Sequence, residues 1–299
     1  MTYLEFQQQI LHYLTEALSP DTRLVIQPIL KNNQVQLDGL TILENGCNIS
    51  PTIYLNYYYE ELQKGASLEF LQQQILKTYL ANKPTESIDV SFYTSYENVS
   101  DRILFKLIQK ESNQELLSQV PHMDFLDLTV VFYCLVTANP VGSATILIRN
   151  EHLHFWDVTP KDLYELALKN TPRLLPPVLH NITEIVEPLL AEPEFCEYSI
   201  EKPVPMYVLT NTGKLYGAAC LLYPDLFSSL SVKLHGDFYI LPSSVHEVIL
   251  LSVNEVESLP ALNAMIHDIN ETQLDPEEIL SDHAYLYSVT GKKLSLPPA

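Results

Sequence analysis

The chain has 299 residues and a formal net charge of −20, from 37 acidic and 17 basic side chains. Its hydrophobic fraction of 46% and charged fraction of 18% indicate a globular protein and exclude a largely disordered chain. A field of this sign repels phosphate backbones and anionic lipids, so we expect no nucleic-acid and no membrane partner. The acidity is greatest in residues 184–282, whose only Lys or Arg side chains are Lys202, Lys214 and Lys233.

The N-terminal residues show no basic and apolar leader, and the most apolar run, residues 126–136, is too short to span a bilayer. We therefore expect a cytoplasmic protein. The cysteines are far apart and form no CxxC pair, which argues against a disulfide framework and against a zinc ribbon. They are Cys47, Cys134, Cys196 and Cys220. The sequence predicts no metal and no cofactor.

Apolar residues recur at helical spacing in residues 3–18 and 68–81, with Ser67 as the N-cap of the second helix. Two β-rich runs, residues 24–30 and 35–43, predict a hairpin. Residues 48–55 fit a short strand or a loop. A short helix is expected to begin near Tyr57 and to end at Gly65.

In the middle of the chain, residues 126–136 are almost continuously apolar, which predicts a strand buried on both faces. Residues 143–149 should pair with it. Residues 88–93 and 102–109 are further strand candidates, although a helix could begin at Arg102. Thr159 as N-cap and Pro160 at the first helical position predict a helix that ends before Pro172.

The stretch 215–252 predicts a strand at 215–222, a helix from Tyr223 to Gly236, and strands at 238–241 and 245–251. Residues 206–210 are expected to form a hairpin with 215–222. The remaining expected elements, in chain order, are a helix near 182–190, a helix at 259–270, an acidic turn at 275–278, a strand at 284–289 and a mobile tail.

This order of elements predicts an α+β fold, with mixed or antiparallel sheets covered by helices. We expect two subdomains, residues 1–171 and 204–299, joined by the Pro- and Glu-rich segment 172–203. A single compact domain is also compatible with the length.

Ser243, Ser244, His246 and Glu247 place hydroxyls, an imidazole and a carboxylate within five residues. A hydrolase needs such groups within hydrogen-bond reach of one another, but neighbours on a strand point to opposite faces. Ser244 followed by Glu247 also matches a capping box. The structural interpretation is favoured, and a catalytic role is kept as the alternative.

Three further residues are candidates for binding. Arg173 could anchor an anion, pair with an acidic partner or bind carboxylates of this chain. Asn211 or Arg173 could assist the Ser/His/Glu cluster, and His283 follows Asp282 beside an acidic turn. His152 and His154 would share one face if extended, but no third metal ligand is placed by the sequence. The pairs His180 with Glu184 and His267 with Glu271 have helical spacing and fit surface pairs.

Several blocks of the sequence are distinctive as a set. They are Gly39-Leu40-Thr41-Ile42, Asn48-Ile49-Ser50-Pro51-Thr52-Ile53-Tyr54-Leu55, Asn170-Thr171-Pro172-Arg173, Leu209-Thr210-Asn211, Tyr216-Gly217-Ala218-Ala219, Leu241-Pro242-Ser243-Ser244-Val245-His246-Glu247-Val248 and Leu280-Ser281-Asp282-His283. Together these blocks resemble an uncharacterised bacterial family catalogued as domain of unknown function 5688. The resemblance covers nearly the whole chain and implies no activity.

The function therefore has to be inferred from the chain itself. No glycine motif of the dinucleotide-binding, P-loop or nucleophile-elbow type occurs. We expect a binding or interaction protein without chemistry of its own, whose partner is an unknown protein or small molecule. The alternative is a hydrolase-like enzyme that uses the Ser/His/Glu cluster at 243–247.

Overall fold

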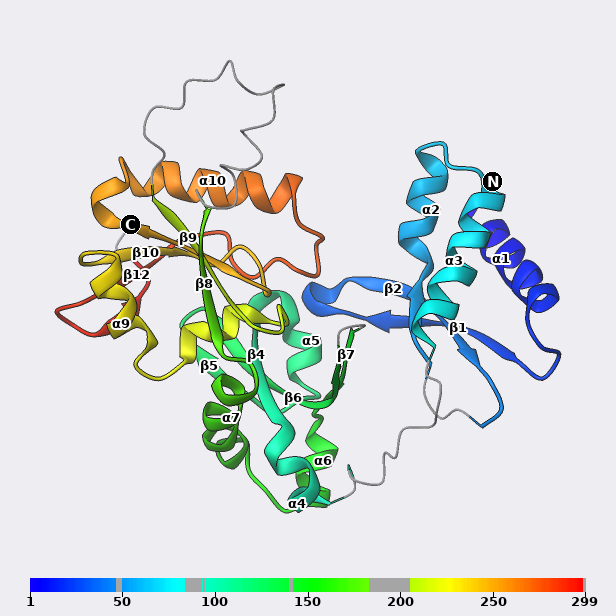
Figure 1. Cartoon of the computed structure of the whole chain (residues 1–299), viewed down its shortest axis with the longest axis horizontal. Helices are drawn as coiled ribbons and strands as arrows, with labels where there is room; N and C mark the ends of the chain where they lie inside the picture. Colours follow the sequence, from blue (N-terminus) through cyan, green and yellow to red (C-terminus); the bar gives the residue numbers. More distant parts are fainter. Residues whose placement is uncertain (47–49, 84–92, 94, 140–141, 183–204, 298–299) are drawn as a thin grey trace. The chain divides into compact units, whose positions relative to one another are not determined.

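A computed structural model describes residues 1–46, 50–83, 93, 95–139, 142–182 and 205–297 (Figure 1). Within these residues the strands form antiparallel sheets that are packed with helices, which confirms the expected α+β class. The chain divides into two compact units, Met1–Phe92 and Tyr93–Ala299. They are called the N-terminal and C-terminal units below.

The N-terminal unit is a three-stranded sheet, β1-β2-β3, packed with helices. Its elements are α1 (Tyr3–Ala17), β1 (Arg23–Leu30), β2 (Gln36–Leu43), β3 (Thr52–Tyr54), α2 (Leu55–Gln63) and α3 (Leu68–Asn82). Phe6 and Ile10 of α1 and Ile75 of α3 are fully buried against Leu40 and Ile42 of β2. The expected hairpin is present, and Ser67 caps α3 by accepting the N–H of Phe70 at 3.2 Å.

The first sheet of the C-terminal unit has the order β4-β6-β5, with β7 also paired to β6. The predicted start at Leu126 is wrong, because that residue has a left-handed backbone and is exposed, and β6 begins at Leu128. Leu128 to Leu135 are all buried, as their near-continuous apolarity predicted. The strands of this sheet and the short helices near it are α4 (Tyr96–Val99), β4 (Ile103–Gln109), α5 (Gln114–Leu117), β5 (His122–Phe125), β6 (Leu128–Asn139), β7 (Gly142–Leu147) and α6 (Asn150–Trp156).

Helix α7 (Pro160–Leu174) begins at Thr159 as predicted but continues past Pro172. Its last turn covers the outer edge of β4. Asn170 Nδ2 donates to the carbonyl of Ile103 at 3.1 Å, and the Thr171 hydroxyl accepts the N–H of Phe105 at 3.2 Å. These side chains occupy the place of a neighbouring strand, so they stabilise a helical turn that Pro172 alone would interrupt.

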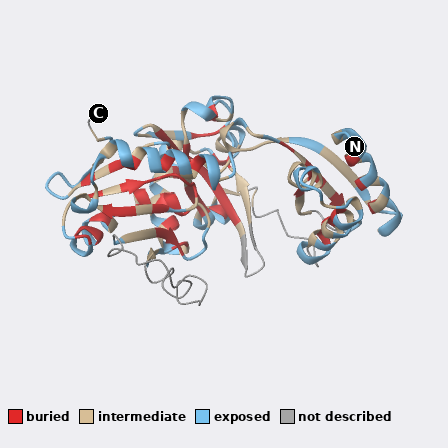
Figure 2. Ribbon diagram, turned by 90° about the horizontal axis from the view of Figure 1, so that it is seen from above, coloured by how far each residue is buried: buried red, intermediate tan, exposed pale blue. Residues whose placement is uncertain are grey.

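The second sheet of the C-terminal unit has the order β13-β12-β10-β11-β9-β8. Helix α10 packs on the face that carries Leu241, whereas Phe227 of α9 packs on Phe238 and Tyr287 of the opposite face. Figure 2 shows the buried residues concentrated along the strands. The elements are β8 (Pro177–Asn181), β9 (Met206–Asn211), α9 (Leu226–Lys233), β10 (Phe238–Leu241), β11 (Val248–Ser252), α10 (Leu259–Thr272), β12 (Tyr285–Ser288) and β13 (Lys293–Ser295).

The expected strand at 215–222 is wrong, and so is its hairpin with β9. Tyr216 has a left-handed backbone with φ 50°, and Gly217–Leu222 form the 3₁₀ helix η6. Strand β9 pairs instead with β8 and β11. The apolarity of this stretch reflects burial, since residues 217–221 are all buried, and the left-handed residue prevents an extended chain.

Two other boundaries also differ from expectation. Part of the tail expected to be mobile pairs with β12 as β13, and β11 begins at Val248 rather than at Val245. The expected segment 172–203 contains β8, which is the neighbour of β9 in one sheet. Residues 183–204 and 84–92, which include the expected helix near 182–190 and most of the expected strand at 88–93, lie outside the described residues.

Candidate functional site

Residues 242–247 form a turn that is hydrogen-bonded to the segment before β12. The N–H of Val245 donates to the carbonyl of Glu278 at 2.8 Å, and the N–H of Leu280 donates to the carbonyl of Ser243 at 2.8 Å. The Ser244 hydroxyl accepts the N–H of His246 at 3.0 Å. Ser243 and Ser244 are both buried within this turn.

The expected capping box is wrong in one respect. Ser244 does bond to a nearby backbone N–H, but strand β11 follows the turn rather than a helix. Glu247 is exposed, and no described residue forms a hydrogen bond or ion pair with its carboxylate. Ser244 therefore stabilises a hydroxyl-bonded turn, without help from Glu247.

His246 forms hydrogen bonds with two elements that are distant in sequence. Its carbonyl accepts the hydroxyl of Thr210 at 2.8 Å, and its Nδ1 accepts the backbone N–H of Tyr216 at 3.3 Å. Because Nδ1 accepts, the neutral ring carries its proton on Nε2, which lies 3.7 Å from Oε1 of Glu278. The side chains of His246 and Glu278 are 31% and 39% exposed, so this pair is open to solvent.

Tyr216 lies at the centre of a mixed group of side chains. Its ring stacks on His246 with centroids 5.6 Å apart and meets Tyr133 edge-on at 5.3 Å. The ammonium of Lys106 lies 4.3 Å from the same ring centre. We call Lys106, Tyr133, Tyr216, His246 and Glu278 the Tyr216 cluster.

The close approach of η6 to the turn depends on Gly217, the residue that follows the left-handed Tyr216. A Cβ at Gly217 would lie 2.2 Å from the carbonyl oxygen of His246 and 2.2 Å from the Thr210 hydroxyl. Only glycine allows η6 to approach the turn this closely. A non-glycine residue in the left-handed region often marks a functional or structural constraint.

Sequence reasoning selected His246 from the Tyr216 cluster but missed its other members. One signal was available for Lys106, which is the only polar residue within the otherwise apolar run 103–108. No local pattern identifies Tyr133 or Tyr216, because their environment is created by β4, β6 and the turn together.

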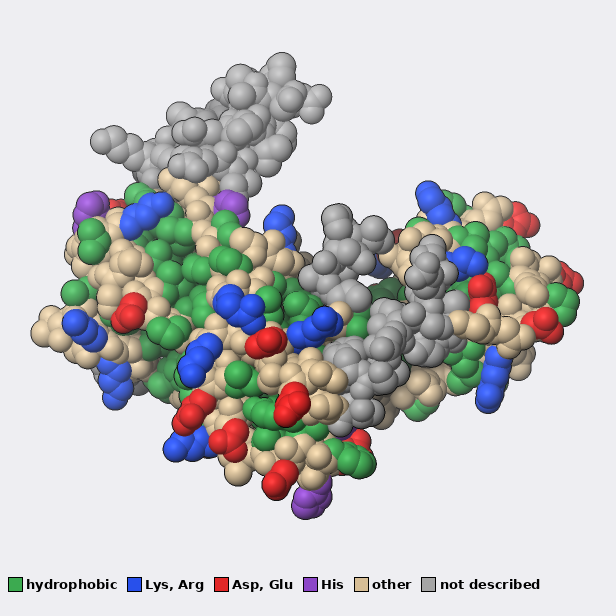
Figure 3. All heavy atoms as spheres, turned by 60° about the horizontal axis from the view of Figure 1, so that its bottom comes forward, with side chains coloured by type: hydrophobic (Ala, Val, Ile, Leu, Met, Phe, Trp, Pro, Cys, Tyr) green, Lys and Arg blue, Asp and Glu red, His purple; other side chains and the backbone are tan. Residues whose placement is uncertain are grey.

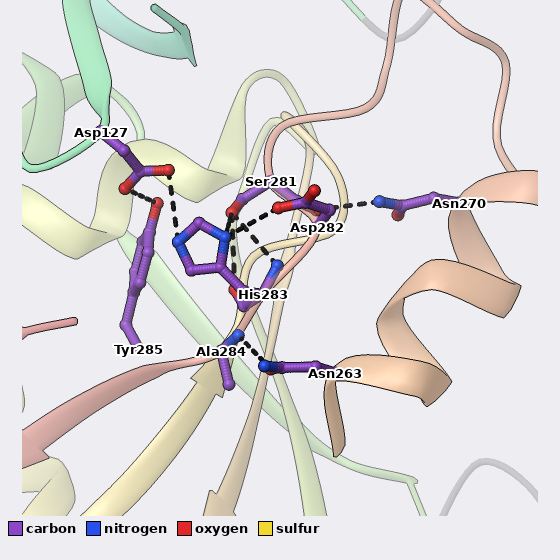
Figure 4. A network of polar contacts seen from close by, with 8 residues as sticks. All are labelled: Asp127, Asn263, Asn270, Ser281, Asp282, His283, Ala284 and Tyr285. Atoms are coloured by element: carbon purple, nitrogen blue, oxygen red, sulfur yellow. Dashed lines mark hydrogen bonds and ion pairs between the residues drawn. The ribbon is translucent and has the colours of Figure 1, made fainter. Parts of the chain in front are cut away.

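His283 forms a second polar network, shown in Figure 4. Its Nε2 lies 3.4 Å from Oδ2 of Asp127, and its Nδ1 lies 2.7 Å from Oδ1 of Asp282. The hydroxyl of Tyr285 donates to the other oxygen of Asp127 at 2.7 Å. Burial raises the pKa of Tyr285 well above its usual range, so it acts as a neutral donor. The network joins β12 to the turn before β6.

The other two binding candidates, Asn211 and Arg173, form hydrogen bonds with backbone groups of this chain. Asn211 is 1% exposed, and its amide bonds to the backbone of Gly213 and Leu215. Arg173 donates to the carbonyl of Asp101 at 2.9 Å and to the side chain of Asn170 at 3.2 Å. Arg173 thus orients the asparagine that covers the edge of β4, and no described carboxylate forms an ion pair with it.

The extended arrangement proposed for His152 and His154 is wrong, because both residues lie on helix α6. Side chains two residues apart on a helix point in nearly opposite directions. His152 Nδ1 accepts the N–H of Arg149 at 2.9 Å, and burial lowers the pKa of His152. His267 lies 3.1 Å from Glu271, which confirms that surface pair, whereas Glu184 lies outside the described residues.

The described residues contain no group of three or more His, Cys, Asp or Glu side chains that could hold a metal ion. Cys134 and Cys220 are buried free thiols, and burial raises their pKa values to about 11 and about 12. Cys47 and Cys196 are not among the described residues. On the face shown in Figure 3, basic and acidic side chains are interspersed among apolar ones.

The fold and the two histidine networks define an α+β protein with antiparallel sheets, in which imidazoles pair with carboxylates at the junctions between elements. The chain belongs to a family of unknown function, DUF5688, whose model matches residues 3–289. No curated protein and no solved structure matches it. None of the helices in the described part of the chain is both long and apolar enough to cross a membrane.

Proposed function

We propose that this protein is a binding or interaction protein without chemistry of its own, and that the Tyr216 cluster is the site where its partner binds. The observation that carries the proposal is the position of His246. Its ring is partly open to solvent, yet Nδ1 is engaged by Tyr216 and Nε2 faces Glu278. An imidazole whose orientation is fixed by stacking and hydrogen bonding suits binding, because its ring and its N–H group are already placed to contact a partner.

The neighbouring hydroxyls support the same proposal. A serine nucleophile needs a free base within hydrogen-bond reach of its hydroxyl. The Ser244 hydroxyl instead accepts a backbone N–H, and Ser243 and Ser244 are both buried. The hydrolase alternative keeps one favourable feature, the pairing of His246 with Glu278, which resembles a base and the group that orients it.

The proposal includes a bacterial cytoplasmic location and no nucleic-acid or membrane partner. The net charge of −20 opposes binding to phosphate backbones and anionic lipids. The free thiols of Cys134 and Cys220 suit a reducing compartment.

A thermal-shift screen of small molecules against three variants tests the proposed function. His246→Asn keeps an acceptor near Nδ1 for the Tyr216 N–H but removes the ring, and Glu278→Gln removes the charge. His267→Asn is the matched control, since it alters an exposed His–Glu pair on α10. Hits should raise the melting temperature of the wild type and of His267→Asn, and should act less on the other two variants.

Equal stabilisation of all variants by every hit would refute the Tyr216 cluster as the binding site. Turnover of an ester or phosphoester that disappears in His246→Asn would instead establish the hydrolase alternative.

A further inference from the structure

Lys106 has no carboxylate partner among the residues that the structure describes. It lies in β4 between the buried residues Phe105 and Leu107, and its ammonium rests against the ring of Tyr216 at 4.3 Å. No described carboxylate forms an ion pair with it, although the protein carries 37 acidic residues. Lys110, just beyond the same strand, forms the usual pair, 2.7 Å from Asp124. The Lys106 ammonium therefore has N–H donors that no described carboxylate accepts.

In the described part of the chain, the Tyr133 hydroxyl is a donor without an acceptor. The residue is 2% exposed, and its buried hydroxyl has no hydrogen-bond partner among the described residues. Buried polar groups are nearly always hydrogen-bonded, and an unpaired one destabilises the folded protein. Nearby, Tyr223 shows the usual arrangement, since its hydroxyl donates to the carbonyl of Leu175 at 2.8 Å.

Lys106 and Tyr133 lie in the same part of the sheet. In the pairing of β4 with β6, Leu104 lies opposite Tyr133 and Lys106 lies opposite Val131. Lys106 and Tyr133 are therefore diagonal neighbours on the same face of the sheet. Both contact the Tyr216 ring, at 4.3 Å for the ammonium and 5.3 Å between ring centroids.

We propose that Lys106 and Tyr133 together bind an anionic oxygen of a small ligand, a carboxylate or phosphate group, beside the Tyr216 ring. An ammonium and a phenol both donate hydrogen bonds and the ammonium is positively charged, so a negatively charged acceptor is the partner that fits both. One positive charge matches one carboxylate, which favours a carboxylate over a doubly charged phosphate. The inference rests on the proposed function and names the chemistry of its ligand.

The test uses acetate and inorganic phosphate as probes, each compared with chloride at equal ionic strength. A bound anion raises the melting temperature along a saturating curve, whereas general salt effects do not saturate. We expect saturation with acetate for the wild type, and a phosphate response would identify a phosphate ligand instead. The saturating rise should be lost in Lys106→Met and in Tyr133→Phe.

Lys233→Met is the matched control, because Lys233 lies 5.0 Å from the ring of Tyr207 in the same kind of contact. It should keep the saturating response. Tyr133→Phe removes only an unpaired hydroxyl, so its melting temperature without anion should equal or exceed that of the wild type. This variant keeps the test valid if Lys106→Met fails to fold.

The inference is overturned if neither anion gives a saturating response, or if Tyr133→Phe responds like the wild type. Neutral hits that depend on His246 would then leave the proposed function intact. If anions saturate through Lys106 and Tyr133 but no hit depends on His246, the anion site stands and the wider Tyr216 cluster fails.

Discussion

The backbone N–H of Tyr216 donates to Nδ1 of His246 at 3.3 Å, while the rings of the same two residues stack 5.6 Å apart. This double contact joins positions 30 residues apart in the chain. It sets the tautomer of His246 and supports the left-handed backbone of Tyr216.

Gly217→Ala should strongly destabilise the protein. The new methyl group would lie 2.2 Å from the His246 carbonyl oxygen and 3.0 Å from Cα of Thr210, and backbone atoms cannot move aside as a flexible side chain can. We expect a loss of about 1–3 kcal/mol or more in the free energy of unfolding, measured by urea denaturation. Gly291→Ala is the control, since its nearest neighbour would be 3.8 Å away, and it should change stability by less than about 0.5 kcal/mol. Equal effects of the two substitutions would contradict the close approach of η6 to the turn.

Ser244→Ala and Glu247→Ala should differ, although the capping box predicted similar effects. Ser244 accepts the N–H of His246 at 3.0 Å in a buried position, so its loss should lower the free energy of unfolding by about 0.5–1.5 kcal/mol. Glu247 is exposed, and its removal should stay within about 0.5 kcal/mol of the wild type. Chemical denaturation of both variants measures the difference. A larger loss of stability in Glu247→Ala than in Ser244→Ala would support the capping box instead.

Alkaline titration should separate exposed from buried tyrosines. Burial raises the pKa values of Tyr133, Tyr223 and Tyr285 well above the ordinary value of 10.0. A raised phenol pKa contributes stability that is complete below pH 10 and is lost as pH rises through the folded-state pKa. Phenolate absorbance should therefore rise in two phases, the second coinciding with unfolding followed by circular dichroism. A single phase near pH 10 with the fold intact would show that these phenols are accessible.

Tyr285→Phe tests one member of this set. Its hydroxyl donates to Asp127 at 2.7 Å, and a hydrogen bond to a charged group contributes about 1.5–3 kcal/mol. We expect a loss of that size at neutral pH, measured by urea denaturation. A neutral result would mean that Asp127 is held by His283 alone.

The start of α7 should show an acid-dependent contribution. Hydrogen bonds from the Thr159 side chain and backbone lower the pKa of Asp162 below its ordinary value of 3.8. Its contribution is therefore complete above that value and is lost as pH falls through the lowered pKa. Asp162→Asn should be less stable than the wild type at neutral pH, and the gap should close in acid. Thr159→Ala should lower stability by about 0.5–2 kcal/mol at neutral pH. A gap that keeps its neutral-pH size at a pH well below the lowered pKa would contradict the capping role.

Much of the fold follows from local signals. Ser67 and Thr159 predicted the starts of α3 and α7, because a cap is a bond between residues three apart. The apolar run in β6 predicted a strand buried on both faces, because apolar side chains occupy both of its faces in alternation. Pro172 was misleading, since the bonds of Asn170 and Thr171 to β4 outweigh a local signal for the helix end.

The sequence by itself determined the α+β class, most helix and strand positions and the acidity, since these depend on neighbouring residues and on composition. Only the tertiary structure decided that residues 217–222 form a 3₁₀ helix, that Ser244 bonds within a turn, and which groups surround His246. The physical reason is separation along the chain. Tyr216, Glu278 and Lys106 meet through elements whose pairing is fixed by burial of whole sheets, and no local pattern of residues encodes that meeting.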